Sequence, residues 1–205
     1  MKRIKSDQII LEDRLFDGYV YVENGIITDV TTEERPADEV FDMTGYYVSP
    51  GFIDIHTHGG GGYRFEGSTE EIVSGCNFHL KHGTTTILAC LYFNMNGQQL
   101  VEQAACVKEA MAKPEGASIA GFYMECPYMN PKFGADRENN PWKGPIKAEE
   151  YQPIIDAVGT AAKVWVLAPE RENILQFVLD ARKNNPTVKF SVGHSEASPQ
   201  QIESL

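Results

Sequence analysis

Continuous apolar segments alternate with amphipathic segments from Gly51 to the end of the chain. The apolar segments predict five strands, at residues 51–55, 84–91, 119–124, 164–167 and 188–192. The segments between them predict helices, at residues 68–83, 98–111, 148–157 and 174–183. Apolar strands separated by helices indicate a parallel sheet, so the expected fold class is α/β.

Local signals support the helix boundaries. Ser68 followed by Glu71 forms the pattern of a capping box, and Gly83 is placed to end the same helix. A further helix is expected at Ser198-Pro199, because Ser is a good N-cap and Pro suits the first helical turn.

Residues 1–50 have a different character and predict a small β domain made of short strands. Asn24-Gly25 separates two β-rich segments, 19–22 and 26–27, which is a strong signal for a type I′ hairpin. The domain boundary is therefore expected between residues 50 and 51, with residues 51–205 forming the second domain.

Residues 51–205 supply only five predicted strands, whereas a closed (β/α)₈ barrel needs eight strands and at least about 200 residues. A half-wound barrel leaves edge strands unpaired. The expectation is that this is the N-terminal part of a longer barrel, with about its first five βα units, preceded by part of a split β-sandwich. The alternative is a complete open doubly wound sheet, which is disfavoured because no glycine-rich phosphate motif follows the first strand.

Bulk composition excludes several classes of function. The 205 residues carry a net charge of -11, so nucleic acid is not an expected partner. No apolar stretch is long enough to span a membrane, and the N-terminus lacks the pattern of a signal peptide. Four cysteines without metal-ribbon spacing favour reduced thiols, and the expected location is the cytoplasm.

The first strand of the second domain ends in His56-Thr57-His58, followed by four glycines. Residues two apart on a strand point to the same side, so both imidazoles can reach one ion. Nitrogen ligands of this kind suit zinc, iron or a similar divalent metal. The alternative is a pair of surface histidines on a loop. The apolar run before the motif and the glycines after it disfavour this alternative.

Two more candidate ligands follow later strands. Glu125 comes after the third strand and His194 after the fifth. Taken singly, Glu125 is expected to be a solvated loop carboxylate, and His194 is expected to be a hydrogen-bonded imidazole in the core. Active-site groups in α/β barrels gather where strands end, so the shared placement predicts a metal site made of His56, His58, Glu125 and His194.

Three segments together resemble the amidohydrolase superfamily: Pro50-Gly51-Phe52-Ile53-Asp54 with its His-x-His, the Glu-x-Pro at Glu125, and Gly193-His194-Ser195. Within the superfamily, the resemblance is to deacetylases of phosphorylated N-acetyl amino sugars. It implies metal-dependent hydrolysis of the acetamide of N-acetylglucosamine 6-phosphate, giving glucosamine 6-phosphate and acetate.

The resemblance also implies roles for individual residues. Glu125 and His194 would hold the main metal, and His56 with His58 would hold a second metal where two are kept. The metal would polarise the acetamide carbonyl. An aspartate after the eighth strand would act as general base, and it is expected beyond Leu205, so no catalytic residue is expected within the chain.

Two positions depart from the family pattern. Cys126 replaces the usual glycine after the glutamate, and a packing role is expected for it. The family's Lys-Gly-x-His segment, which helps to hold substrate, corresponds to Phe133-Gly134-Ala135-Asp136. Ala135 and Asp136 are thus the predicted substrate-binding residues, but an aspartate repels a phosphate unless Lys132, Arg137 or Lys143 compensates.

Three functional hypotheses remain open at this point. The first is the amino-sugar deacetylase, with a small-molecule substrate and a homodimeric assembly. The second is a catalytically incomplete metal-binding or interaction module. The third is an amidohydrolase for another N-acyl amino sugar or a cyclic amide, which Asp136 motivates.

Overall fold

The computed structural model describes residues 1–205, which divide into two compact units, Met1–Gly51 and Phe52–Leu205. Each unit has its own sheet. No helix in either unit combines the length and the apolar character needed to cross a bilayer.

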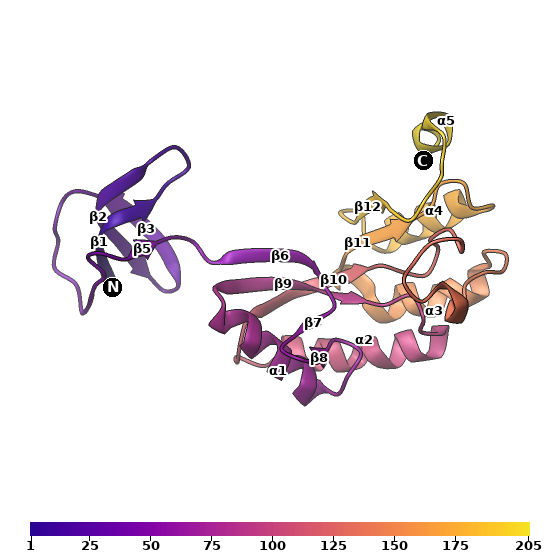
Figure 1. The fold of residues 1–205 in the computed structure, drawn as a ribbon, viewed down its shortest axis with the longest axis horizontal. Helices are drawn as coiled ribbons and strands as arrows, with labels where there is room; N and C mark the ends of the chain where they lie inside the picture. Colours follow the sequence, from indigo (N-terminus) through magenta and orange to yellow (C-terminus); the bar gives the residue numbers. More distant parts are fainter. The chain divides into compact units, whose positions relative to one another are not determined.

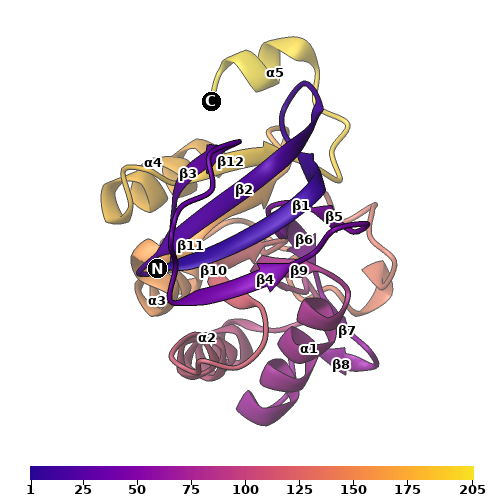
Figure 2. The ribbon, with the colours of Figure 1, turned by 90° about the vertical axis from the view of Figure 1, so that its left-hand side faces the viewer.

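The first unit is a single five-stranded sheet (Figure 2). Its strands are β1 (Lys2–Ile10), β2 (Leu15–Glu23), β3 (Ile26–Thr31), β4 (Glu39–Asp42) and β5 (Tyr47–Val48). The order is β3-β2-β1-β4, and β5 also pairs with β1. Strand β1 is antiparallel to β2 and parallel to both β4 and β5.

The hairpin between β2 and β3 turns at the predicted dipeptide. Asn24 and Gly25 have φ values of 51° and 78°. Positive φ at both central residues is what a type I′ turn requires, so the predicted turn is confirmed.

The second unit is built on a parallel sheet with the order β12-β11-β10-β9-β6. Its strands are β6 (Phe52–Thr57), β9 (Thr84–Leu91), β10 (Ser118–Met124), β11 (Ala162–Leu167) and β12 (Lys189–Val192). Its main helices are α1 (Thr69–Lys81), α2 (Gly97–Met111), α3 (Ala148–Val158) and α4 (Ile174–Asn184). The short elements are β7 (Gly59–Gly60), β8 (Tyr63–Arg64), α5 (Pro199–Glu203) and two 3₁₀ turns, Arg137–Asn139 and Gly159–Ala161.

The strands of this sheet lie side by side in the order in which they occur along the chain. Right-handed crossovers between such strands place every connecting helix on the same face. Figure 1 shows α1, α2 and α3 together on one side of the sheet, and each helix contacts the next in chain order. This is a partial (β/α) barrel, as predicted. The doubly wound alternative is wrong, because that fold reverses its strand order and covers both faces of the sheet.

The main core lies between the sheet and the helices. Its largest fully buried side chains include Phe65, Ile72, Phe122, Trp165 and Phe177. Strand β6 differs from its neighbours, because it pairs only with β9 and its Phe52, Ile53 and Ile55 side chains are exposed. An apolar edge of this kind is available for pairing with another chain, and the homodimer stays a prediction.

The region around the His-x-His motif differs in two ways from the sequence-based expectation. Strand β6 extends to Thr57, so His56 lies within the strand rather than after it. A small hairpin, β7 with β8, follows the motif and was not predicted. The hairpin needs a glycine at Gly59, where φ is 139° and an added Cβ would lie 2.0 Å from the carbonyl oxygen of Tyr63.

The predicted capping box at the start of α1 is present. The Ser68 side chain accepts from the Glu71 amide, and the Glu71 carboxylate accepts from the Ser68 amide at 2.9 Å. Replacing the N-cap serine leaves a helix-terminal amide without its partner, so S68A is expected to lower the free energy of unfolding by about 1 kcal/mol. Urea unfolding followed by helical circular dichroism measures this.

Ser74 provides the matched control, because it lies inside α1 and its hydroxyl donates to the Glu70 carbonyl. Alanine is a good helix former, so S74A is expected to change stability by less than about 0.5 kcal/mol. Equal stabilities of S68A and the parent protein would contradict the capping role.

Candidate metal centre

The four residues predicted to bind metal come together at one edge of the parallel sheet. His56 lies near the end of strand β6, and His58 directly follows the strand. Glu125 follows β10, and His194 lies two residues beyond β12. Because parallel strands all point the same way, their carboxyl ends share an edge, and this brings the four side chains together.

Glu125 is the centre of this group. Its carboxylate is buried, with 6% of the residue exposed. One oxygen, Oε2, lies 2.9 Å from His58 Nε2 and 3.7 Å from His56 Nε2. The other oxygen, Oε1, lies 2.9 Å from His194 Nε2. Three imidazoles from two separate segments therefore meet at one carboxylate.

Cys90, which was not predicted as a ligand, lies in strand β9 and is fully buried. The ligand atoms of His56, His58, Cys90 and Glu125 all lie within 4.8 Å of one another. His194 is not part of this tight group, although it contacts Glu125 through the opposite oxygen. Nothing in the sequence marks Cys90, because a cysteine in an apolar strand has the pattern of an ordinary core residue.

Aromatic rings line the histidine pair. The ring of Tyr123, from β10, lies 4.4 Å from the His56 ring between centroids. Tyr92, which follows β9, meets the His58 ring edge-on at 5.2 Å. These contacts restrict the orientations of both imidazoles.

His194 is held by its own loop. Its backbone is in the left-handed region, with φ of 50°, which is uncommon for a residue other than glycine. Its carbonyl accepts from the Asn130 amide at 3.0 Å. Glu170, which follows β11, accepts from the Ser195 hydroxyl at 2.6 Å and from the Asn130 side chain at 2.8 Å. Glu170 therefore ties the His194 loop to the loop after Glu125, a role that was not predicted from the sequence.

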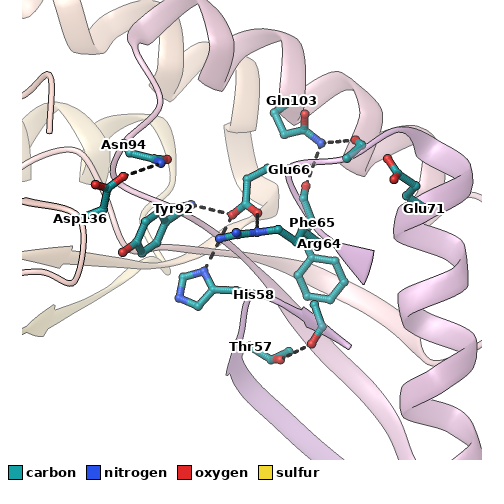
Figure 3. Close-up of polar contacts among 12 residues, drawn as sticks. Thr57, His58, Arg64, Phe65, Glu66, Glu71, Tyr92, Asn94, Gln103 and Asp136 are labelled. Atoms are coloured by element: carbon teal, nitrogen blue, oxygen red, sulfur yellow. Dashed lines mark hydrogen bonds and ion pairs between the residues drawn. The ribbon is translucent and has the colours of Figure 1, made fainter. Parts of the chain in front are cut away.

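The predicted substrate-binding residues lie in that same loop after Glu125, outside the histidine group. Asp136 accepts from the Asn94 side chain at 3.1 Å and from the Asn139 side chain at 2.8 Å (Figure 3). Ala135 is exposed. The two amides are neutral, so they leave the charge of Asp136 in place.

The electrostatics of the group favour a proton on His58 when no metal is bound. Contact with Cys90, followed by contacts with Glu125 and Glu66, raises the pKa of His58 to about 12. Burial raises the pKa of Glu125, but contacts with His58 and His194 outweigh it, so this pKa lies below its usual value. Burial raises the pKa of the Cys90 thiol.

The donor set fits a transition-metal ion. Ligand atoms on a tetrahedral zinc are about 3.3–3.7 Å apart, given bond lengths of about 2.0–2.3 Å. The four donors lie within 4.8 Å of one another, so the widest pair must close by about 1 Å to reach this geometry. Imidazole and thiol donors favour zinc or iron over magnesium or calcium.

Zinc affinity is expected to rise with pH. His58 can bind a metal only as the neutral imidazole, and its raised pKa means that a proton competes for the same nitrogen at neutral pH. Zinc binding near pH 7 should therefore release about one proton from this residue. Titration calorimetry in two buffers of different ionisation enthalpy counts the protons released. Binding without proton release, or affinity that falls as the pH rises from 6 to 8, would contradict this assignment.

Comparison with known proteins identifies the family of this chain. The sequence profile of the amidohydrolase family matches residues 47–203. N-acetylglucosamine-6-phosphate deacetylase of Bacillus subtilis is 29% identical over 203 residues, covering 95% of this chain and 50% of that protein. The human protein of the same name is also 29% identical, covering 96% of this chain and 49% of its own length. The chain thus spans about half the length of the curated relatives that it matches.

A solved structure has a similar fold. It is a variant of N-acetyl-D-glucosamine-6-phosphate deacetylase from Mycobacterium smegmatis in complex with N-acetyl-D-glucosamine-6-phosphate. It is 24% identical with a TM-score of 0.84, and the match covers 99% of this chain and 52% of that one. Because the family profile matches most of the chain and this structure repeats its fold, the chain belongs to the amidohydrolase family.

Proposed function

We propose that the protein contributes to a metal-dependent amide hydrolase that removes the acetyl group from N-acetylglucosamine 6-phosphate. The products would be glucosamine 6-phosphate and acetate. The observation that carries this proposal is the group of imidazoles around the buried Glu125 carboxylate at the carboxyl edge of the sheet. The names of the relatives supply the substrate class.

In this proposal, Glu125, His56, His58 and His194 hold one or two divalent ions, zinc or iron, and Cys90 is a further donor. A bound ion would polarise the acetamide carbonyl and make a water molecule more acidic. The protein supplies the dry surroundings that strengthen these effects, because Glu125 and Cys90 are both buried. None of the residues gathered at the centre is assigned as general base.

A second candidate is a metal-binding module that does not catalyse hydrolysis alone. The observation that favours it is the coverage, since the chain matches only about half of each relative. The two candidates share the metal site and differ in turnover.

Acetate release separates the two candidates. The chain is loaded with zinc or with iron under anaerobic conditions, and acetate is measured with N-acetylglucosamine 6-phosphate as substrate. Release above the background, with a loss of at least about 100-fold in E125Q, is the result that the hydrolase predicts. Zinc bound at the site without acetate release would instead support the module.

Recognition of a phosphate depends on the loop that contains Asp136. A cavity of about 470 Å³ is lined there by Pro131, Lys132, Arg137, Glu138 and Lys143. Lys132 is ion-paired with Glu196, and Lys143 donates to the Glu138 carbonyl at 2.8 Å. Three cations around one cavity, in a chain of net charge -11, support an anion subsite that offsets the charge of Asp136.

Neutralising two of these cations should therefore discriminate between ligands. The R137Q/K143Q protein is expected to bind N-acetylglucosamine 6-phosphate about 30-fold more weakly, because each of the two charged contacts to phosphate is worth on the order of 1 kcal/mol in an exposed site. Binding of unphosphorylated N-acetylglucosamine should not change. Calorimetry of the zinc-loaded protein with both sugars measures this. Equal weakening for both sugars would show that the loop does not bind the phosphate.

A further inference from the structure

His58 uses only one of its two ring nitrogens. Its Nε2 lies 2.9 Å from Glu125, on the side where a metal would bind. Its Nδ1 is buried and has no hydrogen-bond partner. Buried nitrogen atoms of this kind are normally paired, so the environment of Nδ1 calls for an explanation.

The group that faces Nδ1 is the carboxylate of Glu66 (Figure 3). Glu66 Oε1 lies 3.9 Å from His58 Nδ1, which is longer than a hydrogen bond but within an ion-pair distance. The Glu66 side chain is only 14% exposed. A small rotation of either side chain would bring the two atoms to hydrogen-bond distance.

The Glu66 carboxylate is held in place from two sides. The Tyr92 amide donates to Oε1 at 3.1 Å, and Arg64 Nε donates to Oε2 at 3.2 Å. Tyr92 follows strand β9 and Arg64 lies in strand β8, so the carboxylate joins two segments that flank His58.

The backbone on both sides of Glu66 is also fixed. The Gln103 side chain, from α2, donates to the carbonyls of Phe65 and Gly67, both at 2.8 Å. The Phe65 amide donates to the His58 carbonyl at 3.0 Å. Phe65 is fully buried, and Gln103 is 8% exposed. Glu66 is therefore anchored to His58 through the main chain as well as through its side chain.

We propose that Glu66 is a positioning residue for His58, accepting a hydrogen bond from Nδ1–H when Nε2 binds a metal. This rests on the metal site of the proposed function. Such a carboxylate fixes the tautomer and the ring orientation of the histidine and makes Nε2 a stronger ligand. Glu66 comes shortly after the β7–β8 hairpin. The close approach of the two strands at Gly59 therefore helps to bring the Glu66 side chain to His58.

Zinc affinity of the full chain tests the proposal, measured by competition with a chromogenic chelator. In E66Q, the side-chain oxygen can still accept from the Tyr92 amide, but the negative charge is lost. A purely structural Glu66 therefore predicts no change, whereas a positioning role predicts zinc binding at least about 10-fold weaker. Thermal unfolding of the metal-free proteins confirms that E66Q is folded.

The matched control is E71Q. Glu71 is an acidic residue five positions later, and its carboxylate belongs to the capping box of α1. Glutamine serves in a capping box as well as glutamate does, so E71Q should bind zinc as the parent does. Equal weakening in E66Q and E71Q would overturn the proposal, because it would show a general effect of charge.

A second readout does not depend on affinity. Nitrogen-15 NMR of the histidine side chains in the zinc-loaded protein should show His58 with its proton on Nδ1 and zinc on Nε2. In E66A the Nδ1–H should lose its acceptor, so its proton should exchange faster with water and the Nδ1 chemical shift should move. An unchanged Nδ1–H signal in E66A, or equal zinc affinity in E66Q, overturns the role of Glu66 while leaving the metal site intact. Failure of the parent protein to bind zinc would overturn the proposed function itself.

Discussion

The buried carboxylate of Glu125 is the contact on which the site depends. It follows the middle strand of the sheet, whereas the histidines that reach it come from β6 and from the loop after β12, at the two edges. In a flat sheet, each edge strand would lie about 10 Å from β10, at about 4.8 Å per strand. The sheet must therefore curl towards Glu125. Helices placed on one face only are what allow it to curl in this direction.

The strand ends bring the ligands near one another, and contacts between loops then fix the ligand positions. Glu170 bridges the Asn130 and Ser195 segments, and this sets the position of His194 beside Glu125. On the other side, Gln103 holds the backbone around Glu66 against the His58 segment. Metal affinity depends on such supporting groups nearly as much as on the ligands themselves. The five βα units described here thus contain the groups that hold their own metal ligands in position.

The elements of the second unit could be predicted from sequence because each has a local signal. The strand at residues 84–91 is found with the predicted bounds, and α1 begins at the predicted cap, Ser68. The His-x-His motif and Glu125 were visible for the same reason, since polar residues after apolar strands stand out. Helix α2 has a capping box at Asn96 and Gln99 that was not predicted, although its pattern is also local.

The remaining residues could not be found from local signals. Glu66 reaches His58 only because four consecutive glycines fold into the β7–β8 hairpin, and glycines carry no periodicity from which a strand could be inferred. Cys90 looks like any other buried strand residue until the neighbouring strand places the histidines beside it. Both depend on pairing between segments distant in sequence, which a local pattern does not encode.

Cys90 bears on the choice of metal. A histidine and carboxylate site accepts many divalent ions, but a thiolate is a soft ligand that favours zinc or iron over manganese and magnesium. Burial raises the pKa of the Cys90 thiol, so an ion must displace its proton before the sulfur can bind. Only an ion with a strong preference for sulfur gains enough from that bond to offset the loss of the proton. A harder ion would leave Cys90 protonated and bind through the histidines and Glu125 alone. The same four side chains thus make either a three-ligand or a four-ligand site, and the affinity of the ion for sulfur decides between them.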